Sequence, residues 1–414
     1  MIKSMDTRSQ PISKRMVWEA YKKVKANRGS AGIDEVSLQD YEANLSKNLY
    51  KLWNRLSSGS YFPPPVKEVE IPKRDGKKRK LGIPTVGDRI AQMVAKDRLE
   101  EQLDKLFDPS SYGYRKNKSA HEAVKSCQQN CWQYNWVIDM DIKGFFDNIS
   151  HDLMMKALMK HTKERWVLIY VERWLKAPIC GKMGTLSQRE KGTPQGGVIS
   201  PLLANLYLHY AFDKWMRINH PEIRFERYAD DVVVHCKSYE DSARIKLLIK
   251  ERLATCQLTL HEEKTKIVYC KKSGRDIKYP LVSFDFLGYE FKPRRTIDRR
   301  GRIFTGFNPG ISAKSRKRIN DVLKRMSLHT WSTVEIERIA EVLNPKLQGW
   351  INYYGKFRKS DMDYLWSSLN LRLIKWARRK YKRFKGSTRQ AADWLRGVYR
   401  MNQNLFAHWK FVSP

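Results

Sequence analysis

Two acidic stretches carry side chains whose type and spacing could perform phosphoryl-transfer chemistry. In RYADDVVVH, Asp230 and Asp231 stand side by side directly before three valines. In NWVIDMDIKGFFDNI, an apolar stretch runs into Asp139 and Asp141, which share one face of a strand because successive side chains alternate. If the two stretches are neighbours, three or four carboxylates converge, and they either raise one another's pKa or require a metal ion.

The chemistry that suits such a group of carboxylates is metal-assisted phosphoryl transfer. Hard oxygen ligands select Mg²⁺ or Mn²⁺. Two such ions would stabilise the attacking and leaving oxygens of an in-line displacement at phosphorus. The alternative is two unrelated solvated turns, because Asp suits turns and Val suits the strand that follows. Spacing alone leaves both interpretations open.

Two further stretches are suited to binding a nucleotide. The cationic hairpin IPKRDGKKRKLGIPT supplies Lys73 and Arg79, which could hold a triphosphate. In EKGTPQGGVISP, Gly196 and Gly197 lack side chains, so the backbone could approach a nucleotide closely. The plain alternatives are a solvated turn for the first stretch and an ordinary connecting loop for the second.

The elements that must position these residues alternate between helix and strand before the chain becomes purely helical beyond residue 310. Strands are predicted for VKEVEIPK and RKLGIPT, for 136–142, for a pair around 224–236, and for KIVYC and FLGYEF. Helices are predicted in the polar region 1–62, and near 87–106, 119–132, 150–176 and 239–256, with another in which Ser200 and Pro201 form the cap and first turn.

The C-terminal helices have recognisable start and stop signals. Ser312 is predicted to open one helix, and Ser332 with Glu335 forms a capping box before a second helix that Pro345 ends. The change from a mixed to a helical pattern near 292–311 is the best candidate for a domain boundary.

The charge balance indicates a polyanionic partner. The chain of 414 residues has 80 Lys plus Arg against 44 Asp plus Glu, which gives a net charge of +36. Nucleic acid is the leading partner class, and an anionic membrane surface is second. No apolar run approaches the roughly 20 residues that span a bilayer, which argues against a membrane. The six cysteines are interpreted as reduced core residues.

One segment concentrates the positive charge. LRLIKWARRKYKRFK, residues 371–385, has eight basic residues and no acid. A solvated basic helix is the plain alternative, but a run without acids favours a phosphate-binding surface. The cations expected to bind RNA there are Arg378, Arg379, Lys380, Lys382 and Arg383.

The ordered motifs together resemble those of bacterial group II intron reverse transcriptases. Across about 71–291 they are IPKRDGKKRKLGIPT, SYGYRKNKSAHEAV, VIDMDIKGFFDNISH, GTPQGGVISPLLANLYL, RYADD, LHEEKTKIV and FLGYEF. ANRGSAGIDEVSLQDY resembles the N-terminal extension of that family, and LNPKLQGWINYYGKF and LFAHWK resemble its thumb and maturase region. The resemblance covers nearly the whole chain.

The resemblance implies an α+β fold, a right-hand polymerase whose fingers and antiparallel-sheet palm precede an all-α thumb and maturase region. The implied domains are an N-terminal extension at 1–62, fingers and palm at 63–291, and a helical RNA-binding region at 292–414.

The resemblance also assigns roles to residues of the polymerase centre. Asp141, Asp230 and Asp231 match the carboxylates that bind two Mg²⁺ ions, for which Mn²⁺ can substitute, with the Ile142 carbonyl as an extra ligand. Lys264 matches a lysine proposed to protonate the leaving pyrophosphate, and a plain surface lysine is the alternative.

Further roles concern the nucleotide, the template and the primer. The implied dNTP-binding residues are Lys73, Arg79, Gln195 and Phe146, the last of which excludes a ribose 2′-hydroxyl. The implied template and primer contacts are Arg115, Gly196, Leu287 and Gly288. Asp139 and Asp147 are interpreted as structural residues or as caps of the following helix.

The function that follows is an intron-encoded RNA-directed DNA polymerase that binds its intron RNA, assists splicing and copies the RNA into DNA. Its expected partners are group II intron RNA, an RNA template with a DNA primer, target DNA and dNTPs, in a ribonucleoprotein particle of the bacterial cytoplasm. The alternative is a related enzyme adopted by the host for defence or repair. A splicing factor without catalysis is disfavoured because the carboxylates, Phe146 and Gln195 occur together. The oligomeric state, monomer or dimer, is left open.

Nothing follows Pro414, and the last stretch has neither paired Cys nor a His cluster. We therefore expect a form without the nuclease domain of the longest family members, which would need a nick or a replication fork for its primer.

Overall fold

The computed structural model describes residues 9–72, 78–275, 277–298 and 300–414, which form two compact units. The first unit consists of Met1–Ser119, Met140–Val234 and Glu240–Lys266, and the second consists of Ala120–Asp139, His235–Tyr239 and Ile267–Pro414. The fold is mixed helix and sheet, which confirms the predicted α+β class. Every helix in the described ranges is too short or too polar to cross a lipid bilayer.

The N-terminal part of the first unit is helical, as predicted. It contains α1 (Lys14–Ala26), α2 (Leu38–Ala43) and α3 (Leu45–Ser57), and Ser13 caps α1 by accepting a hydrogen bond from the Met16 backbone N–H. Helices α1 and α3 pack against α4 (Val86–Asp104), whose residues are buried for most of its first three turns. That burial makes α4 the central helix of this part.

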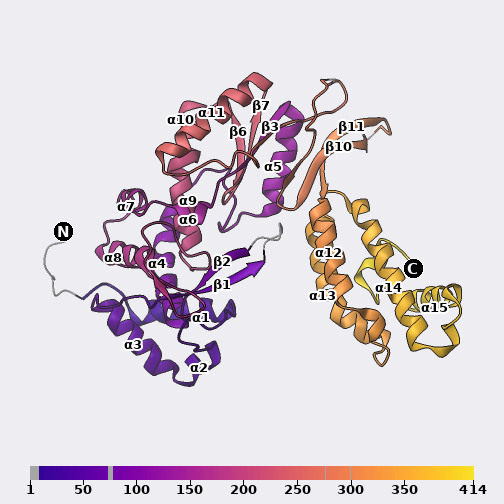
Figure 1. The fold of residues 1–414 in the computed structure, drawn as a ribbon, viewed down its shortest axis with the longest axis horizontal. Helices are drawn as coiled ribbons and strands as arrows, with labels where there is room; N and C mark the ends of the chain where they lie inside the picture. Colours follow the sequence, from indigo (N-terminus) through magenta and orange to yellow (C-terminus); the bar gives the residue numbers. More distant parts are fainter. Residues whose placement is uncertain (1–8, 73–77, 276, 299) are drawn as a thin grey trace. The chain divides into compact units, whose positions relative to one another are not determined.

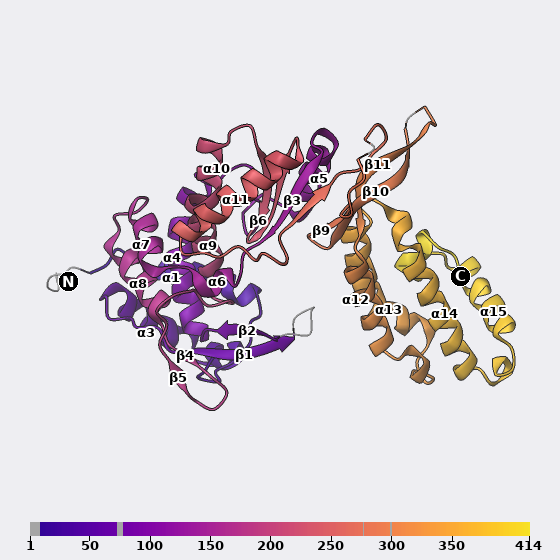
Figure 2. The same ribbon diagram turned by 45° about the horizontal axis from the view of Figure 1, so that its top comes forward.

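A small sheet follows these helices in the order β2-β1-β4-β5. Strands β1 (Val66–Pro72) and β2 (Lys78–Ile83) form the predicted antiparallel hairpin, and β4 (Ile179–Cys180) runs parallel to β1 (Figure 2). Strand β5 (Leu186–Ser187) completes the sheet. The tip of the hairpin, with Lys73, lies outside the described residues.

A second sheet has the order β6-β7-β3-β8 and contains both acidic stretches (Figure 1). Its strands are β6 (Arg224–Tyr228), β7 (Asp231–Cys236), β3 (Trp136–Asp141) and β8 (Lys266–Tyr269). The valines at 232–234 are fully buried, so the apolar run after the Asp pair anchors β7 in the core.

Several helices of the first unit connect these strands. They are α6 (Phe145–Asn148), α7 (His151–Met159), α8 (Arg165–Lys176), α9 (Ser200–Leu208), a π-helical turn at His209–Asp213, α10 (Lys214–Asn219) and α11 (Tyr239–Thr255). Helix α9 is buried on nearly all sides.

The second unit combines a helix, a sheet and a helical bundle. An antiparallel sheet consists of β9 (Phe284–Phe286), β10 (Tyr289–Ile297) and β11 (Ile303–Ile311). Helix α5 (Ala120–Gln133) contacts β11 of this sheet. Helices α12 (Ala313–Arg325), α13 (Ile336–Tyr354), α14 (Asp363–Lys380) and α15 (Thr388–Met401) follow, as Figure 1 shows. The helical structure predicted beyond residue 310 is confirmed, with β11 ending one residue later at Ile311.

Some predicted element boundaries are wrong. Helix α13 continues through Pro345 because Ile339, Leu343 and Leu347 form one buried face across it, and that burial outweighs the roughly 3 kcal/mol that an internal proline costs. The predicted capping box is absent, since the N-cap of α13 is Glu335 without a side-chain bond.

Three other boundaries differ from the prediction. The span 150–176 is two helices, α7 and α8. Ser200 is already helical, and the N-cap of α9 is Ile199. Helix α14 ends at Lys380, and Lys382–Phe384 form a short 3-10 helix. The division at residue 292 stays a prediction, and this residue lies inside β10.

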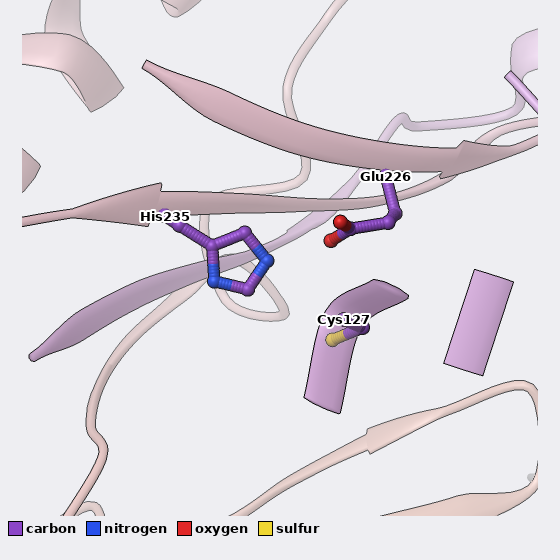
Figure 3. Close-up of side chains that lie close together, drawn as sticks. All are labelled: Cys127, Glu226 and His235. Carbon is purple, nitrogen blue, oxygen red and sulfur yellow. The ribbon is translucent and has the colours of Figure 1, made fainter. Parts of the chain in front are cut away.

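The cysteines are core residues rather than disulfides. None of the six forms a disulfide, and five are buried, which agrees with reduced core thiols. In the second unit, the thiol of Cys127 on α5 lies within 4.8 Å of the His235 ring on β7, and both side chains are fully buried (Figure 3).

Candidate active site

The three predicted metal-binding carboxylates lie at the ends of neighbouring strands. Asp141 is the last residue of β3, Asp231 is the first residue of β7, and these two strands are adjacent in the sheet. Asp230 lies in the turn before β7. Burial raises the pKa of the Asp230 carboxyl, and the charge of Asp141 raises it further, so these two carboxylates are near each other.

A buried ion pair, which the sequence does not reveal, stabilises the turn that contains Asp230. Arg227 and Asp213 are both fully buried, and their side chains form an ion pair at 2.5 Å. The Nη1 atom of Arg227 also donates to the Asn205 Oδ1 at 3.0 Å and to the Ala229 carbonyl at 3.1 Å. Ala229 has a φ of 58°, so these bonds stabilise a backbone conformation that alanine rarely adopts.

Gly113 packs against the same turn. A Cβ atom at this position would lie 2.5 Å from the backbone nitrogen of Ala229, so only glycine fits. Asn205 donates from Nδ2 to the Gly113 carbonyl at 2.7 Å and therefore joins this loop to the Arg227 network. Arg227 stands inside the RYADD motif, but sequence alone gives no sign that its partner is Asp213.

Lys264 lies beside the carboxylates. Its Nζ atom is 3.0 Å from the Asp141 Oδ2, and both side chains are partly exposed. The backbone N–H of His261 donates to the Asp141 carbonyl at 2.8 Å, which fixes the end of β3. A cationic Lys264 is thus placed next to the predicted metal-binding group.

The Gly-rich loop docks on the β1–β2 hairpin and on α6. The backbone N–H of Gly82 donates to the Gln195 carbonyl at 2.9 Å, and that of Thr193 donates to the Phe146 carbonyl at 2.8 Å. Gly196 has a φ of 126°, and a Cβ there would lie 2.5 Å from the Gly82 carbonyl oxygen. The loop therefore requires glycine at this position.

The Gly-rich loop, which contains Gln195, contacts both β2 and α6. Strand β2 carries Arg79, and α6 carries Phe146. The Arg79 Nε atom donates to the Gln195 Oε1 at 2.5 Å, and the Arg79 charge opposes the rise in the pKa of Asp230 that burial causes. Phe146 is buried against Phe145, with ring centroids 5.3 Å apart. The structure thus places Arg79 near the Asp230 carboxyl and joins Arg79 to Gln195.

Arg115 has a different environment from the one expected for a template contact. Its side chain is 7% exposed and forms an ion pair with Asp104 at 2.6 Å. Its guanidinium also donates to the backbone carbonyls of Asp108 and Ser111. These bonds give Arg115 a structural role, and its contact with the template remains a prediction that they do not support.

The predicted primer contacts lie in the tight turn between β9 and β10 of the second unit. Leu287 and Gly288 have φ values of 52° and 82°. The Leu287 carbonyl accepts from the Tyr353 hydroxyl at 2.9 Å, and the Gly288 carbonyl accepts from the Ser315 hydroxyl at 3.0 Å. The turn is therefore anchored to α12 and α13.

The predicted RNA-binding cations divide into two kinds. Arg379, Lys382 and Arg383 are exposed at the surface. Lys380 instead pairs with Glu335 at 2.6 Å, and only 10% of its side chain is exposed. Arg378 is half-buried and donates to the Lys385 carbonyl at 3.1 Å. The surface cations suit phosphate contacts better than Lys380 does.

The residues present fit a divalent cation. The donors are carboxylate oxygens, which suit Mg²⁺. Burial makes the ionised form of Asp230 costly, and Asp141 adds like-charge repulsion, so a bound cation would offset both effects.

Family models match two parts of the chain. The model described as reverse transcriptase (RNA-dependent DNA polymerase) matches residues 71–291, and the model described as group II intron, maturase-specific domain matches residues 316–394.

The chain is also similar to individual proteins. The group II intron-encoded protein LtrA of Lactococcus lactis subsp. cremoris is 26% identical over 426 aligned residues, which cover 81% of this chain and 68% of that protein. Protein YkfC of Escherichia coli is 30% identical over 304 residues, which cover 64% of this chain and 76% of that protein. A solved telomerase from Candida albicans has a TM-score of 0.47 at 13% identity, over 93% of this chain and 70% of that chain.

Proposed function

The chain belongs to the group II intron-encoded reverse transcriptases, which are RNA-directed DNA polymerases, and from this premise we propose that it binds its own intron RNA, assists its splicing and copies it into DNA. The match of residues 316–394 to the maturase-specific domain supports an intron RNA as the partner. We also propose that the enzyme acts in the bacterial cytoplasm as a ribonucleoprotein particle with target DNA.

One observation carries the catalytic part of this proposal: Asp141 ends β3, Asp231 begins the adjacent strand β7, and Asp230 lies in the turn directly before β7. Asp141, Asp230, Asp231 and the Ile142 carbonyl would hold two Mg²⁺ ions. When bound, these ions supply charge stabilisation at the attacking and leaving oxygens of nucleotidyl transfer.

The remaining residues of the site bind and orient the nucleotide. Arg79 is exposed and offers a guanidinium to the triphosphate, together with Lys73, while Gln195 positions Arg79 through its Oε1. The buried Phe146 ring occupies the space beside the sugar and excludes a ribose 2′-hydroxyl. Lys264, whose Nζ lies 3.0 Å from the Asp141 Oδ2, would donate a proton to the leaving pyrophosphate.

Each unit carries residues that would contact nucleic acid. Gly196 lets the backbone approach the template, and the anchored turn at Leu287 and Gly288 supports the primer. The surface cations Arg379, Lys382 and Arg383 would bind intron RNA phosphates. We propose 1–62, 63–291 and 292–414 as the corresponding functional regions.

The deciding experiment combines primer extension with splicing. The purified protein should extend a DNA primer on an RNA template with dNTPs and Mg²⁺, and it should accelerate splicing of the intron RNA that flanks its gene. Extension without any effect on splicing would contradict the maturase role and favour a host-adopted enzyme. Splicing without extension would contradict the polymerase role.

A further inference from the structure

Asp147 is an acidic residue of the nucleotide site to which the proposed chemistry gives no task. It lies in α6, directly after Phe146, and the N-cap of that helix is Gly144. The backbone N–H of Asp147 donates to the Gly144 carbonyl at 3.0 Å, but its side chain points to a different partner. The Gln195 Nε2 donates to the Asp147 Oδ1 at 3.2 Å.

Gln195 thus joins Asp147 to Arg79. Its Nε2 faces the carboxylate, and its Oε1 accepts from the Arg79 Nε at 2.5 Å. An ionised carboxylate can only accept hydrogen bonds, so it binds the NH₂ end of an amide and rejects the oxygen end. Asp147, which only accepts, and Arg79, which only donates, therefore together hold the Gln195 amide with its oxygen toward Arg79.

The backbone of the loop leaves little other freedom to Gln195. Its carbonyl accepts from the Gly82 N–H, and the N–H of Gly192 donates to the Ile149 carbonyl at 2.7 Å. Gly192 has a φ of 84°, and a Cβ there would lie 2.8 Å from the Asp147 carbonyl oxygen. Because the main chain is fixed on both sides, the side-chain amide is the part that still needs an orienting partner.

A second cation near Asp147 offers a competing explanation. Burial lowers the pKa of Arg189 to about 10, and the charge of Asp147 opposes this shift. The Nη1 atom of Arg189 is buried without a hydrogen-bond partner. Asp147 could therefore simply balance Arg189, and a test must separate this role from an effect on Gln195.

We propose that Asp147 is a positioning residue for the incoming nucleotide. By fixing the Gln195 amide, it keeps Arg79 bonded through Nε and turned toward the triphosphate. This inference rests on the proposed function, in which Arg79 and Gln195 contact the dNTP. Asparagine at position 147 keeps the size of the side chain but is neutral and can donate as well as accept, so it would hold the Gln195 amide more weakly.

The experiment measures KM for dTTP and kcat on a poly(rA) template with an oligo(dT) primer. Asp147→Asn should raise KM by roughly 3- to 10-fold, with a smaller change in kcat, because one exposed charge-assisted hydrogen bond becomes a weaker neutral one. In a Gln195→Ala background, Asp147→Asn should change KM by less than about 2-fold, since its effect passes through Gln195. If the two changes multiply instead, Asp147 does not act through Gln195 and the proposal is wrong.

Two further variants serve as controls. Asp152→Asn, an exposed Asp five residues further along the chain, should leave KM unchanged. Arg189→Gln should not restore KM in Asp147→Asn; restoration would show that Asp147 only balances Arg189. A wild-type protein that cannot extend the primer would refute the proposed function and this inference with it. An active wild type with unchanged KM in Asp147→Asn would refute the inference alone.

Discussion

The carboxylate site of the first unit and the basic end of α14 in the second unit use charge in opposite ways. The carboxylate turn depends on Arg227 and Asp213, whose side chains are both fully buried and paired at 2.5 Å. Arg379, Lys382 and Arg383 lie at the surface, in reach of solvent. In a buried network each charge depends on a specific partner, so the loss of one charge has a large effect. Surface cations contribute to phosphate binding through their total charge.

Lys380 shows that a run of cations in the sequence does not guarantee one shared role. It lies within the same basic segment, yet it pairs with Glu335, and its Nζ is 5.8 Å from the centre of the Trp376 ring. Its neighbour Arg379 is exposed. The comparison therefore predicts large effects from single substitutions in the first region and small, salt-dependent effects in the second, with Lys380 as an internal control.

The largest effect should follow from removing a carboxylate. Asp230→Ala or Asp231→Ala should lower the rate of primer extension by roughly 10³-fold or more, because a metal ligand is lost. Binding of intron RNA should persist, since no surface cation changes. Extension near the wild-type rate in either variant would refute the metal-site interpretation.

The next largest effect concerns stability. Asp213→Asn leaves the Arg227 charge buried without its partner, which should cost about 3–5 kcal/mol of the free energy of unfolding. The control Asp393→Asn breaks an exposed pair with Arg396 at 2.6 Å and should cost less than about 1 kcal/mol. Denaturant unfolding measures both, and equal losses would remove the contrast between buried and exposed charge.

Selectivity should change by a smaller factor when Phe146 is truncated. Phe146→Ala opens space beside the sugar, so the preference for dNTPs over rNTPs, as a ratio of kcat/KM, should fall by about 10- to 100-fold. Competing extension reactions with each nucleotide measure this ratio. An unchanged preference would show that another group excludes the 2′-hydroxyl.

The sequence predicted the elements of this site well because their signals are local. The valines after Asp231 and the apolar residues before Asp141 indicate buried strands, and these strands are β7 and β3 of one sheet. The neighbours that complete the site are not local. Asp213 lies 14 residues from Arg227, and Gln195 lies 116 residues from Arg79, so only the folded chain identifies these partners.

The errors in the second unit have a similar cause. Pro345 is a strong local stop signal, but the buried face of α13 continues through it. Residues 371–385 have the composition of a uniformly basic surface. Lys380 is nevertheless mostly buried, where its Nζ pairs with Glu335 and lies near the Trp376 ring. Local signals fail where tertiary burial provides more free energy than the local preference.

Neutralising surface charge should give a modest effect that depends on salt. The triple variant Arg379→Gln, Lys382→Gln and Arg383→Gln should bind intron RNA more weakly and reduce the salt slope of log K by about 0.7 for each phosphate that the variant no longer neutralises. The matched variant Lys380→Gln should instead lower the melting temperature and leave the slope unchanged. Binding titrations across salt concentrations measure the slope for the wild type and both variants. Equal slopes in all three proteins would mean that the segment at 371–385 does not face phosphate.

The smallest predicted effect is on thermal stability. A substitution at the carboxylate site should raise the melting temperature. Burial and the Asp141 charge raise the pKa of Asp230, so its protonated form is favoured in the folded protein. The stability it contributes is complete below its unfolded value of 3.8 and is lost as the pH rises through the raised folded value. At neutral pH without Mg²⁺, Asp230→Asn should therefore melt at a higher temperature than the wild type.

Added Mg²⁺ should reverse that order. A cation that binds only the folded state stabilises it by mass action, so the wild type should gain stability while Asp230→Asn gains less. Asp152→Asn serves as the control and should follow the wild type with and without Mg²⁺. If Asp230→Asn is less stable than the wild type without Mg²⁺, the Asp230 carboxylate is compensated by the protein itself. The charge of Asp230 would then be compensated by protein groups, as the charge of Asp213 is by Arg227, and the site would not need a bound cation.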